Sequence, residues 1–153
     1  MSIFPTRILL ATDGSWEAEL AATTAADLAK STGCELHVVH VGETPNVYHP
    51  ERHGYRAEYE DHEKAARRLL EGQVEHVREA GATVAQAHLR MGRADEEIVD
   101  LAHSLDAGMI VMGSKGRGRL RRALLGSVSD SVVRHAHCPV TIVREDTAPD
   151  TGW

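Results

Sequence analysis

The sequence contains few aromatic residues, two cysteines and no long apolar run. Phenylalanine, tryptophan and tyrosine make up 4% of its 153 residues, so the hydrophobic core has to be aliphatic. Cys34 and Cys138 lie far apart and do not outline a disulfide framework, which favours a reducing compartment. No stretch approaches the roughly 20 apolar residues that a membrane-spanning helix needs. We therefore expect no membrane span.

Positive charge is scarcer than negative charge, and the formal net charge is -6. The phosphate backbone repels an acidic chain, which argues against a general nucleic-acid-binding protein but leaves room for a local basic site. The apolar run at 8–11 is short and Asp13 follows it closely, unlike a secretory signal peptide. We expect a cytoplasmic protein.

The order of the expected elements predicts the fold. Apolar runs predict strands over 7–12, 36–41, 83–91, 109–112 and 139–143, and segments with helical spacing lie between them. Such alternation is typical of a parallel sheet with helices on both faces. The predicted fold class is α/β, an open doubly wound five-stranded parallel sheet, for which we assume the order 3-2-1-4-5. Residues 1–144 form one domain and 145–153 a flexible tail.

Local signals predict where several elements begin and end. Ser15 can cap the first helix, and Gly33 can end it. Ser127 and Asp130 form a capping-box-like pair at the start of the fourth helix. The third strand has one apolar face and one polar face, with His88 on the polar side, which predicts a half-exposed edge strand.

The carboxyl ends of the first and fourth strands are the first candidates for a binding site. Open parallel sheets bind ligands beyond the carboxyl ends of their strands, where the strand order reverses. With the assumed order, Asp13 and Gly113 meet at that point. Asp13 also has a simpler interpretation as an ordinary turn residue, because Asp-Gly is common in turns.

The segment 113–129 has the chemistry of an anion-binding site. Gly113, Gly116 and Gly118 let backbone amides approach a phosphate closely. A helix that starts at Ser127 adds its N-terminal amides and dipole. Five cations lie within eight positions: Lys115, Arg117, Arg119, Arg121 and Arg122. We expect one or two of them to contact phosphate and the others to be solvated.

Two well-known phosphate motifs do not match this segment. Gly113 and Gly118 have the spacing of a P-loop, but Arg119 and Leu120 stand where lysine and serine or threonine belong. A dinucleotide fingerprint that starts at Gly116 has arginine in place of its third glycine. It also follows the fourth strand instead of the first.

The pattern Gly-x-x-Gly, nine residues, Gly-Ser does match. It starts at Gly113 and ends at Gly126-Ser127, and it resembles the ATP-binding signature of universal stress proteins. Three further stretches, 8–15, 36–41 and 134–140, resemble that family in the same order. The resemblance covers roughly residues 3–144.

This resemblance implies a nucleotide-binding domain that binds ATP, with Mg or Mn held largely through the phosphates. It implies that Asp13 and Val41 contact the adenosine and that the glycine motif contacts ribose and phosphates. With neighbouring positions, the candidate site is Ala11, Thr12, Asp13, Val41, Met112, Gly113, Ser114, Gly116, Arg117, Gly118, Gly126, Ser127, Val128 and Ser129. The resemblance also implies a homodimer. We expect it to form through Pro139 to Val143, because an apolar strand at a sheet edge is a pairing hazard if exposed.

We interpret the chain as a nucleotide-dependent switch in stress response or signalling, with at most slow ATP hydrolysis and an unknown protein partner. Two alternatives stay open: an ATPase or phosphotransferase, and an interaction module that binds no nucleotide. No spacing indicates a catalytic triad, and the ten histidines do not form an evident ligand set, so we expect no catalytic residue and no dedicated metal site. The loop 42–56 is a candidate lid or partner surface.

Overall fold

The computed structural model describes residues 2–45, 54–114 and 125–145, in which strands and helices alternate. The strands are β1 (Arg7–Ala11), β2 (Glu35–Gly42), β3 (Val84–Met91), β4 (Met109–Gly113) and β5 (Val140–Val143). The helices are α1 (Trp16–Thr32), α2 (Tyr55–Glu79), α3 (Ala94–Ser104) and α4 (Ser127–His135). No helix among the described residues is long and apolar enough to cross a membrane.

The five strands form one parallel sheet in the order β3-β2-β1-β4-β5, which confirms the predicted fold class and strand order. β1 is the centre of this sheet, since Leu10 lies beside Val38 of β2 on one side and Val111 of β4 on the other. The chain moves outward in opposite directions from β1. The carboxyl ends of β1 and β4 therefore form the switch point at which such sheets bind ligands.

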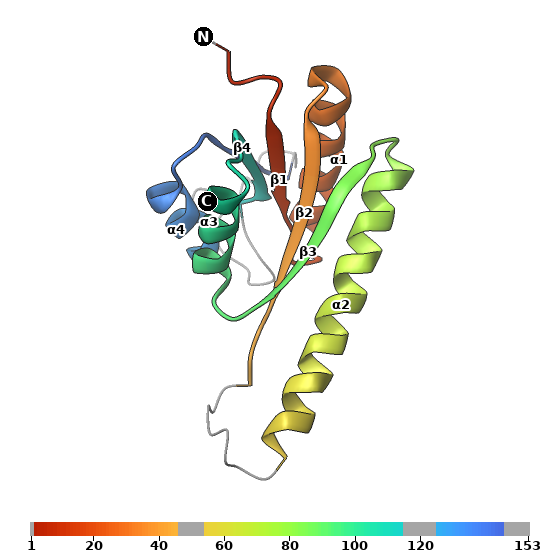
Figure 1. Cartoon of the computed structure of the whole chain (residues 1–153), viewed down its shortest axis with the longest axis vertical. Coiled ribbons are helices and arrows are strands. Elements are labelled where there is room, and N and C mark those ends of the chain that lie inside the picture. The colour runs from red at the N-terminus through yellow and green to blue at the C-terminus, as the bar shows by residue number, and fades with distance from the viewer. Residues whose placement is uncertain (1, 46–53, 115–124, 146–153) are drawn as a thin grey trace, which may run out of the picture.

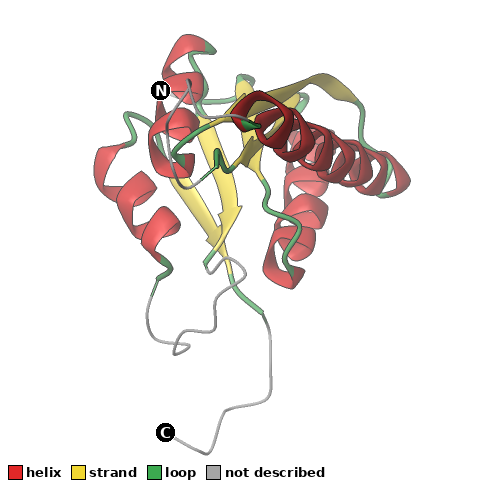
Figure 2. Cartoon of the chain, turned by 90° about the horizontal axis from the view of Figure 1, so that it is seen from below, coloured by secondary structure: helices red, strands yellow, loops and turns green. Residues whose placement is uncertain are grey.

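Helices cover both faces of the sheet, α1 and α2 on one and α3 and α4 on the other (Figures 1 and 2). On the first face Ile8 and Leu10 pack in one cluster with five buried alanines of α1 and with Val77 of α2. On the second face Leu9 and Val39 belong to a separate apolar cluster with α3 and α4. Both layers are aliphatic, as the small number of aromatic residues predicts.

The predicted ends of α1 are confirmed, and the predicted capping box of α4 is wrong. Ser15 Oγ accepts a hydrogen bond from the Ala18 amide at 3.2 Å, and Gly33 ends α1 in the left-handed conformation. α4 has Gly126 as its N-cap and no side-chain cap. Ser127 is therefore already inside the helix, and Asp130 accepts instead from Nε of Arg134 at 2.9 Å.

β3 is an edge strand, as expected, but the burial of its side chains differs from the prediction. His88 is buried, whereas Ala85 and Ala87 are exposed. The pairing of β3 with β2 shifts register between Leu36 and His37, and His88 then stacks on His37 with 3.0 Å between Nε2 and Nδ1. Burial, followed by the charges of His37 and Arg90, lowers the pKa of His88.

Candidate functional site

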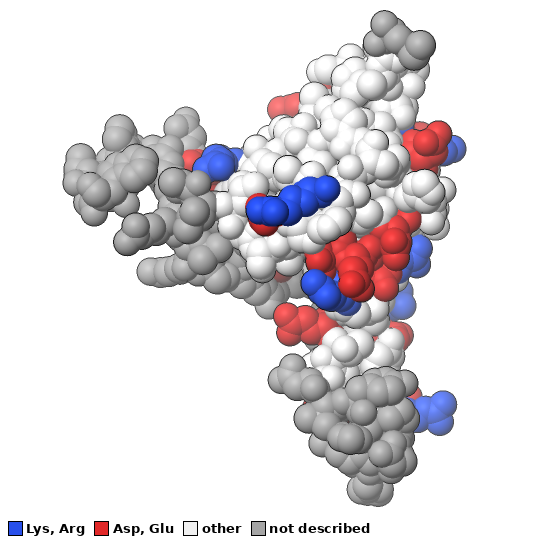
Figure 3. All heavy atoms as spheres, turned by 90° about the vertical axis from the view of Figure 1, so that its left-hand side faces the viewer, with Lys and Arg blue, Asp and Glu red and all other residues white. Residues whose placement is uncertain are grey.

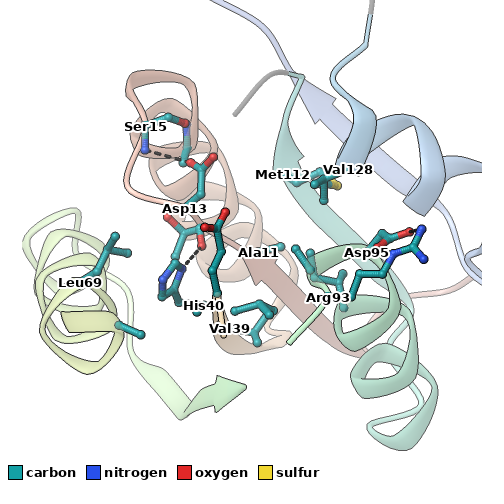
Figure 4. A pocket seen from close by; sticks show the side chains of 18 of the residues that line it. Ala11, Asp13, Ser15, Val39, His40, Leu69, Arg93, Asp95, Met112 and Val128 are labelled. Carbon is teal, nitrogen blue, oxygen red and sulfur yellow. Dashed lines mark hydrogen bonds and ion pairs between the residues drawn. The ribbon is translucent and has the colours of Figure 1, made fainter. Parts of the chain in front are cut away.

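A cleft with a volume of about 1170 Å³ opens at the carboxyl edge of the sheet, where β1 and β4 diverge. The turn between β1 and α1 forms one wall, and the first residues of α3 and α4 form another (Figure 4). The ends of β2 and β3 and the middle of α2 complete it. The cleft lies where the strand order predicts a ligand.

The structure brings together most of the candidate residues around this cleft. Those that line it are Ala11, Thr12, Asp13, Val41, Met112, Gly113, Gly126, Ser127, Val128 and Ser129. Ser114 is buried behind the lining. Gly116, Arg117 and Gly118 lie outside the described residues, as do most of the loop 42–56 and of the C-terminal tail.

The turn after β1 is fixed by hydrogen bonds on both sides. Asp13 Oδ1 accepts from the Ser15 amide at 2.9 Å, which is the turn chemistry that its simpler interpretation describes. The Thr12 carbonyl bonds Nδ1 of the buried His40 at 2.8 Å, and the Thr12 hydroxyl donates to Oε1 of Gln73 in α2 at 3.0 Å. Asp13 thus lines the cleft from a turn with little freedom to move.

The two ends of the segment 115–124 are held together at the base of the cleft. The Ser114 carbonyl accepts from the Gly126 amide at 2.7 Å and from the Ser129 hydroxyl at 2.6 Å. The Ser114 hydroxyl donates to Oε2 of Glu17 at 2.5 Å, and it therefore bonds α1 instead of lining the cleft. These contacts fix the start of α4 relative to β4.

Gly113 has a structural reason to be glycine that does not involve a ligand. A Cβ atom at this position would lie 3.0 Å from Cβ and 3.1 Å from the carbonyl carbon of Glu17. Part of this contact is backbone, which cannot rotate away. A side chain at position 113 would therefore need small shifts of β4 or α1, which glycine avoids.

The N-terminus of α4 supplies the strongest anion-binding feature of the described cleft. Gly126, Ser127 and Val128 line it, and the first amides of a helix have no partner within the helix. The helix dipole adds partial positive charge at the same place. Phosphate groups bind such helix ends readily.

The wall opposite Asp13 contains an ion pair linked to a second helix. Arg93, the residue before α3, donates from Nε to Oδ1 of Asp95 at 3.1 Å. Oδ2 of Asp95 accepts from the Ser131 hydroxyl of α4 at 2.7 Å. The Ser131 hydrogen bond is the main cause that lowers the pKa of Asp95, and Arg93 lowers it further against the opposing effect of burial.

Comparison with known proteins identifies the family. The universal stress protein family model matches residues 5–144. The chain belongs to the universal stress protein family.

The relatives agree with this assignment over nearly the whole length. A Staphylococcus aureus (strain USA300) protein named for the family is 36% identical over 144 residues, which are 93% of this chain and 86% of that protein. The universal stress protein UspA from Lactobacillus plantarum has the same fold, with a TM-score of 0.79, 24% identity and coverage of 91% of this chain and 97% of that one. An Archaeoglobus fulgidus universal stress protein in complex with dAMP has a TM-score of 0.64 and 27% identity over 93% of this chain and 99% of that one.

In this family member, three residues at the α3 wall were missed by sequence reasoning: Arg93, Asp95 and Ser131. One signal could have found Arg93, since Gly92 directly follows β3 and the ends of parallel strands share one edge of the sheet. No signal pairs Asp95 with Ser131, which lie 36 positions apart and meet only because α3 packs beside α4.

Charges on the α3 and α4 face of this universal stress protein are mixed. Figure 3 shows acidic side chains gathered beside separate lysine and arginine side chains, without a continuous basic surface in the part of this face that the structure describes. Among the described residues no three histidine, cysteine, aspartate or glutamate side chains are grouped to hold a metal ion. The described chemistry of the site is thus that of helix amides, hydroxyls and a few charges.

Proposed function

We propose that this universal stress protein binds an adenine nucleotide, preferentially ATP, in the cleft at the switch point and acts as a nucleotide-dependent switch. The observation that carries the proposal is that the Asp13 turn and the N-terminus of α4 line one cleft. The family relative in complex with dAMP supports a nucleotide as the ligand.

Each part of the cleft suits one part of the nucleotide. Asp13 accepts hydrogen bonds from the sugar hydroxyls, and Val41 gives the base an apolar contact. The amides of Ser127 and Ser129 and the exposed Ser127 hydroxyl hold the phosphates. A Mg or Mn ion is held through these phosphates, because the described residues offer no ligand cluster of their own. A cleft of about 1170 Å³ has room for this ligand.

The proposed switch depends on the phosphates binding at the start of α4. The start of α4 is bonded through Ser114 to β4 and to Glu17 of α1, so a ligand on α4 acts on the contacts that hold these elements together. A ligand that binds one arrangement better than another shifts the population toward it. Turnover is slow in this proposal, since the cleft supplies an electrostatic cradle and no assigned base.

A substitution at Ser127 tests the phosphate site without weakening the helix. Ser127 is exposed, lies in the first turn of α4 and lines the cleft. Ser127→Asp adds a negative charge that the helix dipole favours but that repels a phosphate. We expect the melting temperature of the free protein to stay level or rise, while the shift caused by Mg-ATP is lost. Ser127→Asn is the matched neutral control and should keep most of that shift.

Thermal-shift titration with Mg-ATP, AMP, dAMP, cAMP and GTP measures how much each nucleotide raises the melting temperature of the wild type and of each variant. A ligand at about 100 times its dissociation constant stabilises the fold by roughly 2.7 kcal/mol, which moves the melting temperature by several degrees. If ATP gives no shift and denatured protein releases no bound nucleotide, the interaction-module alternative replaces the proposal. ADP release at about one per second or faster supports the ATPase alternative.

We further propose that the protein is a cytoplasmic homodimer paired through Pro139 to Val143. β5 is an edge strand of the sheet, and its four side chains are only half-buried. Such a strand is a template for pairing with a second copy. Both cysteines are free thiols, which agrees with a reducing compartment. A strict monomer by light scattering at micromolar concentration contradicts the dimer, and cell fractionation tests the location.

A further inference from the structure

The balance of charge in the cleft makes one arginine conspicuous. Of the described residues that line the cleft, four are acidic: Asp13, Glu43, Asp61 and Asp95. Arg93 is the single lysine or arginine in that same described lining. A polyanion that enters this described part of the cleft is repelled by the four carboxylates, and Arg93 offsets part of that repulsion.

Hydrogen bonds and an ion pair to neighbouring side chains hold the side chain of Arg93 in place. Its Nε and Nη2 atoms donate to the two Asp95 oxygens at 3.1 and 3.4 Å, and Nη1 lies 3.4 Å from Oε1 of Glu96. Asp95 is held in turn by the Ser131 hydroxyl of α4. The guanidinium is therefore carried next to the helix whose N-terminus opens into the cleft, and Figure 4 shows Arg93 on the same wall as Met112 and Val128.

The guanidinium also keeps capacity for a ligand. The Arg93 side chain is 71% exposed, whereas the Asp95 side chain is 14% exposed. A guanidinium has five N–H donors in a planar fork, more than its bonds to Asp95 and Glu96 use. Such forks bind phosphate in a bidentate manner, and ion pairs as exposed as that with Glu96 exchange at little cost.

We propose that Arg93 is a specificity-determining residue that contacts the anionic part of the ligand and makes affinity rise with the number of phosphates. This inference rests on the proposed nucleotide function. Asp95 is the positioning residue, since it holds Arg93 on the cleft wall. Arg93 directly precedes α3, Asp95 lies on α3 and Ser131 on α4, all outside the glycine motif.

The test is calorimetric titration of adenosine, AMP and ATP against wild-type protein, Arg93→Gln, Arg93→Lys and Arg90→Gln. Arg90 is an exposed arginine three positions earlier that does not line the cleft, so it is a control for loss of one positive charge. We expect Arg93→Gln to weaken ATP by about tenfold or more, the size of one lost charge-assisted hydrogen bond, while adenosine binding stays within twofold. Arg93→Lys restores part of the loss, and Arg90→Gln changes little.

The outcomes separate this inference from the function on which it rests. Wild-type protein that binds none of the three ligands overturns both. Wild-type protein that binds ATP, with Arg93→Gln weakening adenosine and ATP by the same factor or neither of them, overturns the inference alone. An equal loss of ATP affinity in Arg90→Gln also overturns it, since general charge would then explain the effect.

Discussion

Of the junctions between a strand and a helix that border the cleft, two are built in different ways. At the first, between β1 and α1, Asp13 and Ser15 bond amides two and three positions ahead. At the second, between β3 and α3, the N-cap Arg93 makes no side-chain cap bond. Its neighbour Asp95 is fixed instead by Ser131 of another helix.

The difference shows two ways in which a site wall becomes rigid. The caps of the β1–α1 junction are local, and Thr12 adds bonds from the same turn to His40 and to Gln73 of α2. At the β3–α3 junction the hydrogen bond that fixes Asp95 comes from α4, so the position of this side chain depends on how α3 packs against α4. A ligand that touches α4 can therefore change the second wall while the first stays fixed.

Glycine substitutions should lower the free energy of unfolding the most, and by different amounts at the two junctions. Gly92 has φ of 132°, where side chains are strained, and a Cβ there would meet only Oε1 and Cγ of the Glu97 side chain, at 3.6 and 3.9 Å, so backbone strain dominates. We expect Gly92→Ala to lower the free energy of unfolding by about 2–3 kcal/mol. Gly14 has φ of 78°, a left-handed conformation that alanine adopts at a cost of about 1–2 kcal/mol. Urea denaturation measures both, and an equal loss would contradict the ranking.

The contact between α3 and α4 should come next in size. Asp95→Ala removes a carboxylate that accepts from both Ser131 and Arg93. In a double-mutant cycle with Ser131→Ala we expect a coupling of about 1.5 kcal/mol, typical of a hydrogen bond to a charged group. Ser104→Ala, at the exposed end of α3, is a control with little expected effect. Additive losses in the cycle would show that Asp95 and Ser131 do not act as a pair.

The same contrast explains what could be predicted from the sequence. The parallel sheet and its two helix layers follow from the alternation of elements, which is a local pattern. The strand order was assumed, and with that assumption the strand ends gave the position of the cleft. The cap at Ser15 is local too and was predicted correctly. The burial of His88 was not predicted, because it depends on a register shift between β2 and β3. The Asp95–Ser131 bond was missed for a similar reason, since it needs two helices in place.

Gly113 shows a limit of motif reasoning in physical terms. Its place in the glycine pattern suggested an approach of backbone to phosphate, and the structure adds a close contact with Glu17 of α1. A Gly113→Ala variant therefore perturbs the packing of β4 against α1 whether or not a nucleotide binds. Ser127 is the cleaner position for a ligand test, because it is exposed.

Loss of the local cap should have a smaller effect than loss of the α3–α4 contact. Ser15→Ala removes the hydroxyl that accepts from the Ala18 amide, and such caps contribute about 1 kcal/mol. We expect that decrease in unfolding free energy, with Ser15→Asp as the control that keeps an acceptor and much of the stability. Hydrogen exchange should localise the change to the first turn of α1. A change that spreads to α3 would contradict the independence of the two junctions.

The acid titration of Asp95 should give the smallest effect and the most direct view of the α3–α4 contact. The Ser131 hydrogen bond is the main cause that lowers the pKa of Asp95, so Ser131→Ala should raise that pKa toward its usual value in an NMR titration of the carboxyl carbon. Because the folded-state pKa lies below the unfolded one, the unfolded chain binds the proton first as pH falls. The stabilisation is complete above the unfolded pKa near 3.8 and is lost as pH falls through the folded pKa. An unchanged pKa in Ser131→Ala would leave Arg93 as its cause and would make the second junction as local as the first.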